Sequence, residues 1–132
     1  MRVLKKSLVI AVDFDGVIAN AEKWQGYNVL APPVKDCEKY LRKLHDEGWI
    51  IIVWSVRPAH ISLRNYLRQF QIPFDALNKD VKEWYNDLGH NVFANVYLND
   101  KDIKSLGKKW NWRRMYWRLR FKFRYMYERK KK

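Results

Sequence analysis

The sequence predicts a mixed α/β fold built on a mainly parallel sheet, and two patterns support this expectation. Apolar runs typical of buried strands alternate with stretches in which apolar residues recur every three or four positions. The run from Trp49 to Trp54 is continuous in β-branched and aromatic residues, as in a strand covered on both faces. Strands that alternate with helices form βαβ units, which predicts a three-layer sheet with helices on both faces.

The first expected strand, residues 8–12, runs directly into Asp13, Phe14, Asp15 and Gly16. Residues two apart at a strand end can direct their side chains to the same side, so the two acids face one small site. Two such carboxylates repel each other unless a metal ion or a proton compensates, which suits Mg²⁺, a phosphoryl group or both. The same residues also fit a plain turn and helix cap.

Two helices and three more strands are expected after this turn. Pro33 suits a first helical turn, and Gly48 offers a stop. The first expected helix covers about 34–46 and has an apolar face of Cys37, Tyr40, Leu41 and Leu44. The elements expected after it are a strand over 49–54, a helix with an apolar face of Leu63, Tyr66, Leu67 and Phe70, a turn and short strand over 72–77, a helical or irregular stretch over about 80–88, and a strand over 92–98.

Polar residues follow three of these strands at the carboxyl end, which is the edge where parallel sheets bind ligands. The first strand is followed by Asp13 and Asp15, and the second by Ser55. The last strand is followed by Asn99 and Asp100. Because parallel strands end at the same edge, these side chains are expected to converge, which favours a site over a simple cap.

The charge of the chain is unevenly distributed. The net charge is +13, and residues 107–132 hold 12 Lys or Arg and one acid, Glu128. We therefore expect one domain over residues 1–106, followed by a basic, aromatic extension over 107–132. No apolar run approaches the roughly 20 residues that cross a bilayer, the start does not resemble a secretory signal, and Cys37 is a lone cysteine, so we expect a cytoplasmic protein.

The extension has an ambiguous periodicity. Aromatic and basic residues alternate from Trp117 to Tyr125 as in a strand, whereas Trp112, Tyr116 and Leu119 follow a helical spacing, and we expect a helix. Basic side chains with aromatic rings suit single-stranded nucleic acid, but packing on the domain or lying on an anionic membrane also fits. The expected nucleic-acid contacts are Lys108, Lys109, Trp110, Arg113, Arg114, Arg118, Arg120, Lys122 and Arg124.

These motifs resemble the haloacid dehalogenase superfamily of phosphohydrolases, which have Asp-x-Asp-Gly after the first strand and Thr or Ser after the next. The resemblance covers roughly residues 7–106 and is greatest to small bacterial and phage hydrolases without a cap domain, which implies a Rossmann-like sheet. Motifs typical of that type are Trp24-Gln25-Gly26, Pro32-Pro33, Ile72-Pro73-Phe74-Asp75 and Asn99-Asp100-Lys101.

The resemblance implies a Mg²⁺-dependent phosphatase that acts on phosphomonoesters, with nucleotides or nucleic-acid ends as candidate substrates. Asp13 would be the nucleophile, Asp15 the general acid and base, and Ser55 a hydrogen-bond donor to the phosphoryl group. Mg²⁺ would be held by Asp13, by the backbone carbonyl of Asp15, and by Asn99 or Asp100. The phosphate would contact Phe14, Val56, Arg57 and Lys79.

Two positions depart from the superfamily pattern. Asn91 stands where a lysine is expected before the last strand, and Asn99 stands where the first acid of an Asp-Asp pair is expected. These departures support an alternative, a catalytically weakened scaffold that binds nucleic acid through its extension. Only about 17 residues separate Gly16 from the first expected helix, so the resemblance implies an open site. Such a site suits a macromolecular phosphate, or else it is covered by a neighbouring subunit or by the extension.

Overall fold

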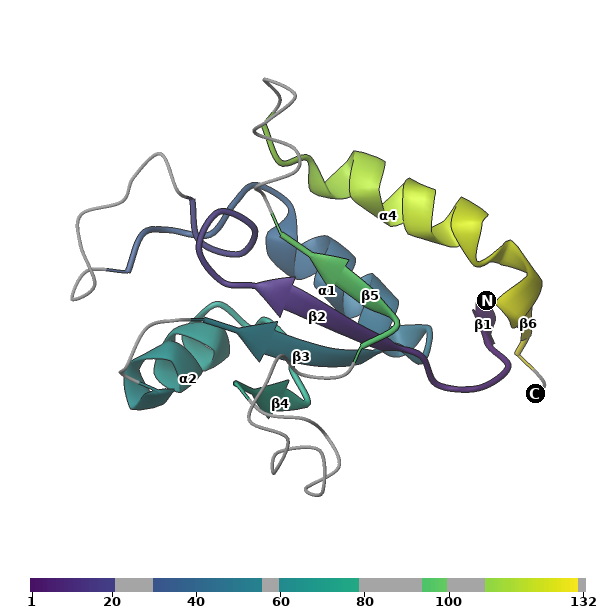
Figure 1. Cartoon of the computed structure of the whole chain (residues 1–132), viewed down its shortest axis with the longest axis horizontal. Helices are drawn as coiled ribbons and strands as arrows, with labels where there is room; N and C mark the ends of the chain where they lie inside the picture. Colours follow the sequence, from purple (N-terminus) through teal and green to yellow (C-terminus); the bar gives the residue numbers. More distant parts are fainter. Residues whose placement is uncertain (21–29, 56–59, 79–93, 100–108, 131–132) are drawn as a thin grey trace.

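The computed structural model describes residues 1–20, 30–55, 60–78, 94–99 and 109–130, and a four-stranded, wholly parallel sheet lies at its centre (Figure 1). This confirms the expected mixed α/β fold with a mainly parallel sheet. The strands are β2 (Val9–Asp13), β3 (Ile50–Trp54), β4 (Ala76–Leu77) and β5 (Val96–Leu98), in the order β4-β3-β2-β5.

The strand order reverses beside β2. From β2 the chain adds β3 and then β4 on one side, and it returns to place β5 on the other side. The strand β2 is therefore paired in parallel with both neighbours, with Ile10 opposite Ile51 and Val96. Sheets with this reversal bind ligands in the crevice beyond the carboxyl ends of the two strands that flank it.

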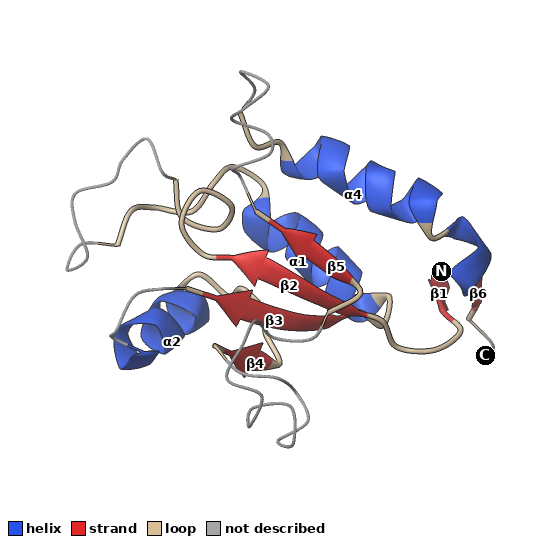
Figure 2. Ribbon diagram, viewed as in Figure 1, coloured by secondary structure: helices blue, strands red, loops and turns tan. Residues whose placement is uncertain are grey.

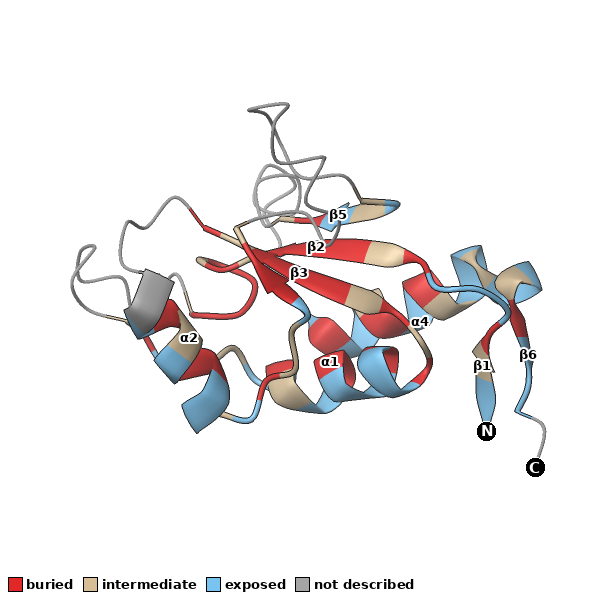
Figure 3. Ribbon diagram, turned by 90° about the horizontal axis from the view of Figure 1, so that it is seen from below, coloured by how far each residue is buried: buried red, intermediate tan, exposed pale blue. Residues whose placement is uncertain are grey.

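Alternate residues of the central strands enter two separate clusters. Ile10, Val12 and Val53 belong to the main core, whereas Ala11 and Ile52 lie in a small cluster on the opposite face. Residues 51–53 are all buried, which confirms that β3 is covered on both faces (Figure 3). The helices α1 (Cys37–Asp46), α2 (His60–Gln69) and α4 (Trp112–Lys122) contribute to the main core.

All three described helices thus pack on one face of the sheet (Figure 3). The helical or irregular stretch expected over 80–88 lies outside the described residues, so helices on the second face stay a prediction. No helix in the described ranges is long and apolar enough to cross a membrane.

The expected apolar faces of the first two helices are confirmed. In α1 the four predicted residues Cys37, Tyr40, Leu41 and Leu44 are all buried, and in α2 Leu63, Tyr66 and Leu67 are buried while Phe70 is half-buried.

The expected start of the first helix was wrong by three residues. Pro33 does not serve a first helical turn, because it forms a bridge with Ala19. Asp36 then takes a left-handed conformation with φ 65°, and the helix begins only at Cys37. The expected stop is confirmed: Gly48 has φ 105°, a conformation that glycine adopts without steric cost.

The C-terminal segment is helical over α4, as expected, and continues into a 3₁₀ turn, η3 (Arg124–Met126), and a strand, β6 (Tyr127–Arg129). The strand pairs antiparallel with β1 (Arg2–Leu4), so both ends of the chain meet in a small second sheet (Figure 2). This sheet was not expected. The expected boundary at residue 106 lies outside the described residues, but Trp112, Tyr116 and Leu119 enter the main core.

A buried carboxylate joins the C-terminal segment to the rest of the fold. Glu47, at the end of α1, accepts hydrogen bonds from the hydroxyls of Tyr116 and Tyr127, the latter at 2.8 Å. The Tyr127 hydroxyl also accepts the Trp49 indole N–H at 2.8 Å. The guanidinium of Arg120 lies 3.9 Å from the centre of the Tyr127 ring, and its Nε is 3.8 Å from a Glu47 oxygen. The end of α1, the residue before β3, the helix α4 and the strand β6 therefore meet at one polar cluster.

We predict that this cluster weakens the fold at alkaline pH. Burial is the main cause that raises the pKa of Tyr127 to about 12, and burial with the Glu47 hydrogen bond also raises the pKa of Tyr116. The unfolded chain releases these protons near pH 10.0 while the folded protein keeps them. The stabilisation is therefore complete below pH 10 and falls as the pH rises towards about 12.

Denaturant unfolding at several pH values between about 9 and about 11.5 measures this loss. Tyr127→Phe removes one of the two groups and is expected to make the fall in unfolding free energy shallower. Tyr125→Phe changes an exposed tyrosine of the same segment and is the matched control. Equal slopes for the wild type and Tyr127→Phe would contradict the assignment.

Candidate functional site

The carboxyl edge of the central strands brings together three of the predicted site residues. Asp13 ends β2 and lies opposite Trp54 of β3. On the other side Val12 pairs with Leu98, so one further step along both strands places Asn99 beside Asp13. Ser55 follows Trp54 directly. Asp13 therefore lies between the ends of β3 and β5, where the order of the strands reverses.

Backbone hydrogen bonds fold the loop after β2 back on itself. The Phe14 carbonyl accepts the N–H groups of Ile18 at 3.0 Å and Ala19 at 2.8 Å, and the Gly16 N–H donates to the Ala19 carbonyl at 2.8 Å. Gly16 has φ 93°, which a residue with a side chain rarely adopts. The loop is thus fixed by its own backbone, and it holds Asp15 close to the end of the strand.

Apolar side chains anchor this loop in the core. Phe14, Val17 and Ile18 are fully buried, and the Phe14 ring packs edge to face on Tyr66 with 5.1 Å between ring centres. The indole N–H of Trp112, in the first turn of α4, donates to the Val17 carbonyl at 2.8 Å. With these groups turned inward, the half-buried Asp13 and Asp15 are the charged residues of the turn that reach the surface.

Asn78 holds the end of β3 and was not singled out from the sequence. Its side-chain oxygen accepts the Ser55 N–H at 2.6 Å, and its own N–H donates to the Val53 carbonyl at 2.8 Å. It follows β4 with φ 57°, a left-handed conformation that Asn tolerates better than most residues. Ser55 itself is buried. The feature of the sequence that could have indicated this role is an Asn directly after the expected short strand.

The expected role of Phe14 in holding phosphate was wrong in this geometry. Its side chain is fully buried, and its backbone N–H donates to the Trp54 carbonyl at 2.8 Å, which continues the pairing of β2 with β3. The other expected phosphate contacts, Val56, Arg57 and Lys79, lie outside the described residues. The same holds for the expected metal ligand Asp100 and for Asn91, which replaces the lysine of the superfamily pattern.

The donors at the edge are hard oxygen atoms, which suit Mg²⁺ because this ion binds one or two carboxylates and keeps several waters. They comprise the carboxylate of Asp13, the backbone carbonyl of Asp15 and the side-chain oxygen of Asn99. Within the described ranges, no group of three or more His, Cys, Asp or Glu residues gathers as a metal cage.

The basic residues of the C-terminal segment do not share one surface. Lys109, Arg113, Arg114, Arg118, Lys122 and Arg124 are exposed. Trp110 is instead half-buried against Trp112, with 5.6 Å between ring centres, and Arg120 lies over Tyr127. Trp110 and Arg120 thus pack inward, and their contact with nucleic acid stays a prediction. Lys108 lies outside the described residues.

We predict that Asn78 stabilises the end of β3 through its side chain and its backbone conformation. Asn78→Ala removes the acceptor and puts at positive φ a residue that tolerates this conformation less well than Asn, so it should lower the unfolding free energy by about 1–3 kcal/mol for the lost acceptor alone. Asn78→Gly removes only the acceptor and should cost less, and Asn78→Asp keeps the acceptor and is the control. Denaturant unfolding measures all three, and an Ala variant as stable as the Asp variant would contradict this role.

Comparison with known proteins adds to the fold but names no activity. No protein-family model and no curated protein match the chain. A conserved protein of Bacteroides thetaiotaomicron is 25% identical, with a TM-score of 0.69 over 89% of this chain and 93% of its own. A structural-genomics target from Vibrio cholerae is 25% identical, with a TM-score of 0.46 over 72% of this chain and 80% of its own. The first likeness supports the mixed α/β architecture described above.

Proposed function

We propose that the protein is a Mg²⁺-dependent phosphatase of the haloacid dehalogenase type, in which Asp13 forms a covalent bond to phosphorus. One observation carries the proposal: Asp13 ends the central strand where the strand order reverses, with Asp15 held beside it in a backbone-bonded loop. A ligand is expected at that point of a parallel sheet. The flanking strand ends supply Ser55 and Asn99.

The proposed chemistry divides the work between the two acids. A carboxylate oxygen of Asp13 attacks phosphorus in line, and the bond from phosphorus to the leaving oxygen breaks while Asp15 gives that oxygen a proton. Asp15 then takes a proton from water, which attacks phosphorus and releases Asp13 and inorganic phosphate. The Ser55 hydroxyl donates a hydrogen bond to the transferring group.

Mg²⁺ held by the Asp13 carboxylate, the Asp15 backbone carbonyl and Asn99 would reduce the repulsion between the Asp13 carboxylate and the phosphate. Asn99 contributes an oxygen without a charge, so the ion would be held less tightly than by an acid at position 99. This residue favours the second candidate, a scaffold with weakened turnover. The two candidates differ in rate and in metal affinity, and the second binds nucleic acid through the C-terminal extension.

The proposal includes an open site without a cap domain. Two intervals outside the described residues are 21–29, between β2 and α1, and 79–93, between β4 and β5. Neither interval has the 50 or so residues that form an independent domain. An exposed phosphomonoester, including one at the end of a larger molecule, would therefore have direct access to Asp13.

We predict that hydrolysis depends on Asp13. Release of 4-nitrophenol from 4-nitrophenyl phosphate should require Mg²⁺, and Asp13→Asn should lower the rate about a thousandfold or more because the nucleophile is lost. Asp46→Asn, an exposed acid on α1, is the matched control and should keep the wild-type rate. Equal rates for Asp13→Asn and the wild type would disprove the nucleophile.

We also predict that restoring a charge at position 99 strengthens metal binding. Asn99→Asp adds a carboxylate beside Asp13 and should lower the Mg²⁺ dissociation constant by about tenfold, as measured by calorimetry and by the Mg²⁺ dependence of hydrolysis. Asn65→Asp makes the same change at an exposed position on α2 and should leave the constant unchanged. A constant that rises or stays the same in Asn99→Asp would rule out this residue as a ligand.

A further inference from the structure

We infer that the outer face of α4 binds single-stranded nucleic acid, independently of hydrolysis at Asp13. The outer face is defined here by three aromatic rings, Trp117, Phe121 and Tyr125, and by three arginines, Arg114, Arg118 and Arg124. It differs from the surface expected from the sequence, because Trp110 and Arg120 turn inward and three other rings take the exposed positions.

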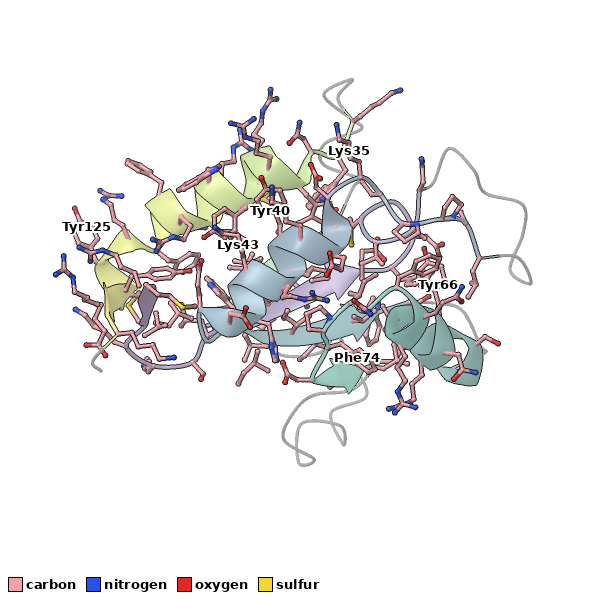
Figure 4. The ribbon with its side chains drawn as sticks, turned by 180° about the vertical axis from the view of Figure 1, so that it is seen from behind. Lys35, Tyr40, Lys43, Tyr66, Phe74 and Tyr125 are labelled. Carbon is pink, nitrogen blue, oxygen red and sulfur yellow. The ribbon has the colours of Figure 1, made fainter. Side chains whose placement is uncertain are left out.

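The three rings are strongly exposed, in contrast to the aromatic residues that the core buries. Trp117 is 56% exposed, Phe121 69% and Tyr125 74%. Within α4, Trp117 and Phe121 are four residues apart and therefore neighbours on one side of the helix. Tyr125 follows in η3, at the outer end of the helix, where Figure 4 shows it away from the sheet. Rings gathered in this way form a stacking surface rather than scattered apolar contacts.

Another side of α4 already packs on the domain. Trp112, Tyr116 and Leu119 are buried, and Tyr116 contacts Tyr40 of α1 with 5.3 Å between ring centres. Lys43 of α1 also lies over the Tyr116 ring (Figure 4). The helix is therefore already fixed to the domain by one aromatic side, and the second aromatic side faces outward.

Arg124 holds two of the exposed rings in place. Its guanidinium carbon lies 4.2 Å from the centre of the Phe121 ring and 4.4 Å from that of Tyr125. Its nitrogens donate to the Phe121 carbonyl at 2.8 Å and to the Tyr125 hydroxyl at 3.0 Å. Rings that are restrained before a ligand arrives lose less conformational freedom on binding, so each base stacked on them is bound more tightly.

The charges around the rings match a phosphate backbone. Arg114 and Arg118 lie four residues apart beside the aromatic pair, and both are exposed. Glu128 is the single acid among residues 107–132, against 12 Lys or Arg. Basic side chains that alternate with rings can neutralise phosphates while successive bases stack, which is how proteins bind unpaired strands without strong sequence preference.

A membrane surface fits the same segment less well. A helix that lies on a bilayer needs a broad apolar face to bury among the lipids. In α4 the apolar face packs in the core of the domain. The exposed side carries arginines next to the Trp117 and Phe121 rings and is not broadly apolar. Duplex nucleic acid is also less suitable, because its bases are already stacked and cannot use the rings.

The test is fluorescence anisotropy of a labelled 20-residue oligothymidylate with the full-length protein, in buffer with EDTA so that hydrolysis does not take part. The wild type should bind, and added salt should weaken binding. Trp117→Ala and Phe121→Ala should each raise the dissociation constant by about tenfold, within the range measured for stacked bases. Trp117→Phe keeps a ring and should retain most of the affinity.

Matched variants separate this face from the general positive charge. Arg118→Gln should weaken binding and reduce the salt dependence by about 0.7 in the logarithmic slope. Arg68→Gln, an exposed arginine in the last turn of α2, and Tyr97→Ala, an exposed ring on β5, should leave the dissociation constant unchanged. Unfolding midpoints equal to that of the wild type verify that each variant is folded.

Three results would overturn the inference. The first is no binding of the oligonucleotide at low salt. The second is binding that the ring variants do not weaken, or that is as tight for a duplex of the same length. The third is binding to vesicles of phosphatidylserine and phosphatidylcholine without binding to the oligonucleotide. Because no arm measures hydrolysis, failure of the phosphatase proposal leaves these outcomes unaffected.

Discussion

Parallel pairing on both sides of β2 is the constraint on which the rest of the structure depends. A central strand with parallel neighbours sends its own end and theirs to one edge, so Asp13, Ser55 and Asn99 become neighbours although they are far apart in sequence. Beyond Phe14 the chain leaves the sheet and turns back through Gly16, with its apolar side chains in the core. An acidic, accessible strand end is the result of this topology.

The second organising feature is the burial of Glu47. A carboxylate inside a core is costly unless hydrogen-bond donors surround it, and here they come from Tyr116 on α4 and Tyr127 on β6. The C-terminal segment thus supplies the hydrogen-bond donors that the Glu47 carboxylate, in the first half of the chain, requires. The inner side of α4 is held against the domain by these contacts, so the basic side chains on its outer side have a defined position.

Much of the fold was predictable because it depends on periodicity. The buried run of β3 and the apolar face of α1 follow from spacing alone, and both were correct in the structure. The pairing of β1 with β6 was not predictable, since three-residue strands at opposite ends of a chain have no pattern that links them. For the candidate site, the strand order explains why Asp13 and Asn99 meet. The roles of Asn78 and Phe14 depend on single hydrogen bonds that spacing does not encode.

The hydrogen bond from the Trp112 indole to the Val17 carbonyl joins the C-terminal helix to the acidic loop after β2. It makes the C-terminal helix a structural support of the acidic loop, so the segment is not a detachable arm. Cutting the chain before α4 would uncover the core, leave Glu47 without its tyrosines and release the loop that carries Asp15. A truncated protein would therefore lose the outer face of α4, part of its stability and the geometry of the acidic site together. Only single substitutions on the exposed side of α4 can separate ligand binding by this helix from its structural support of the loop.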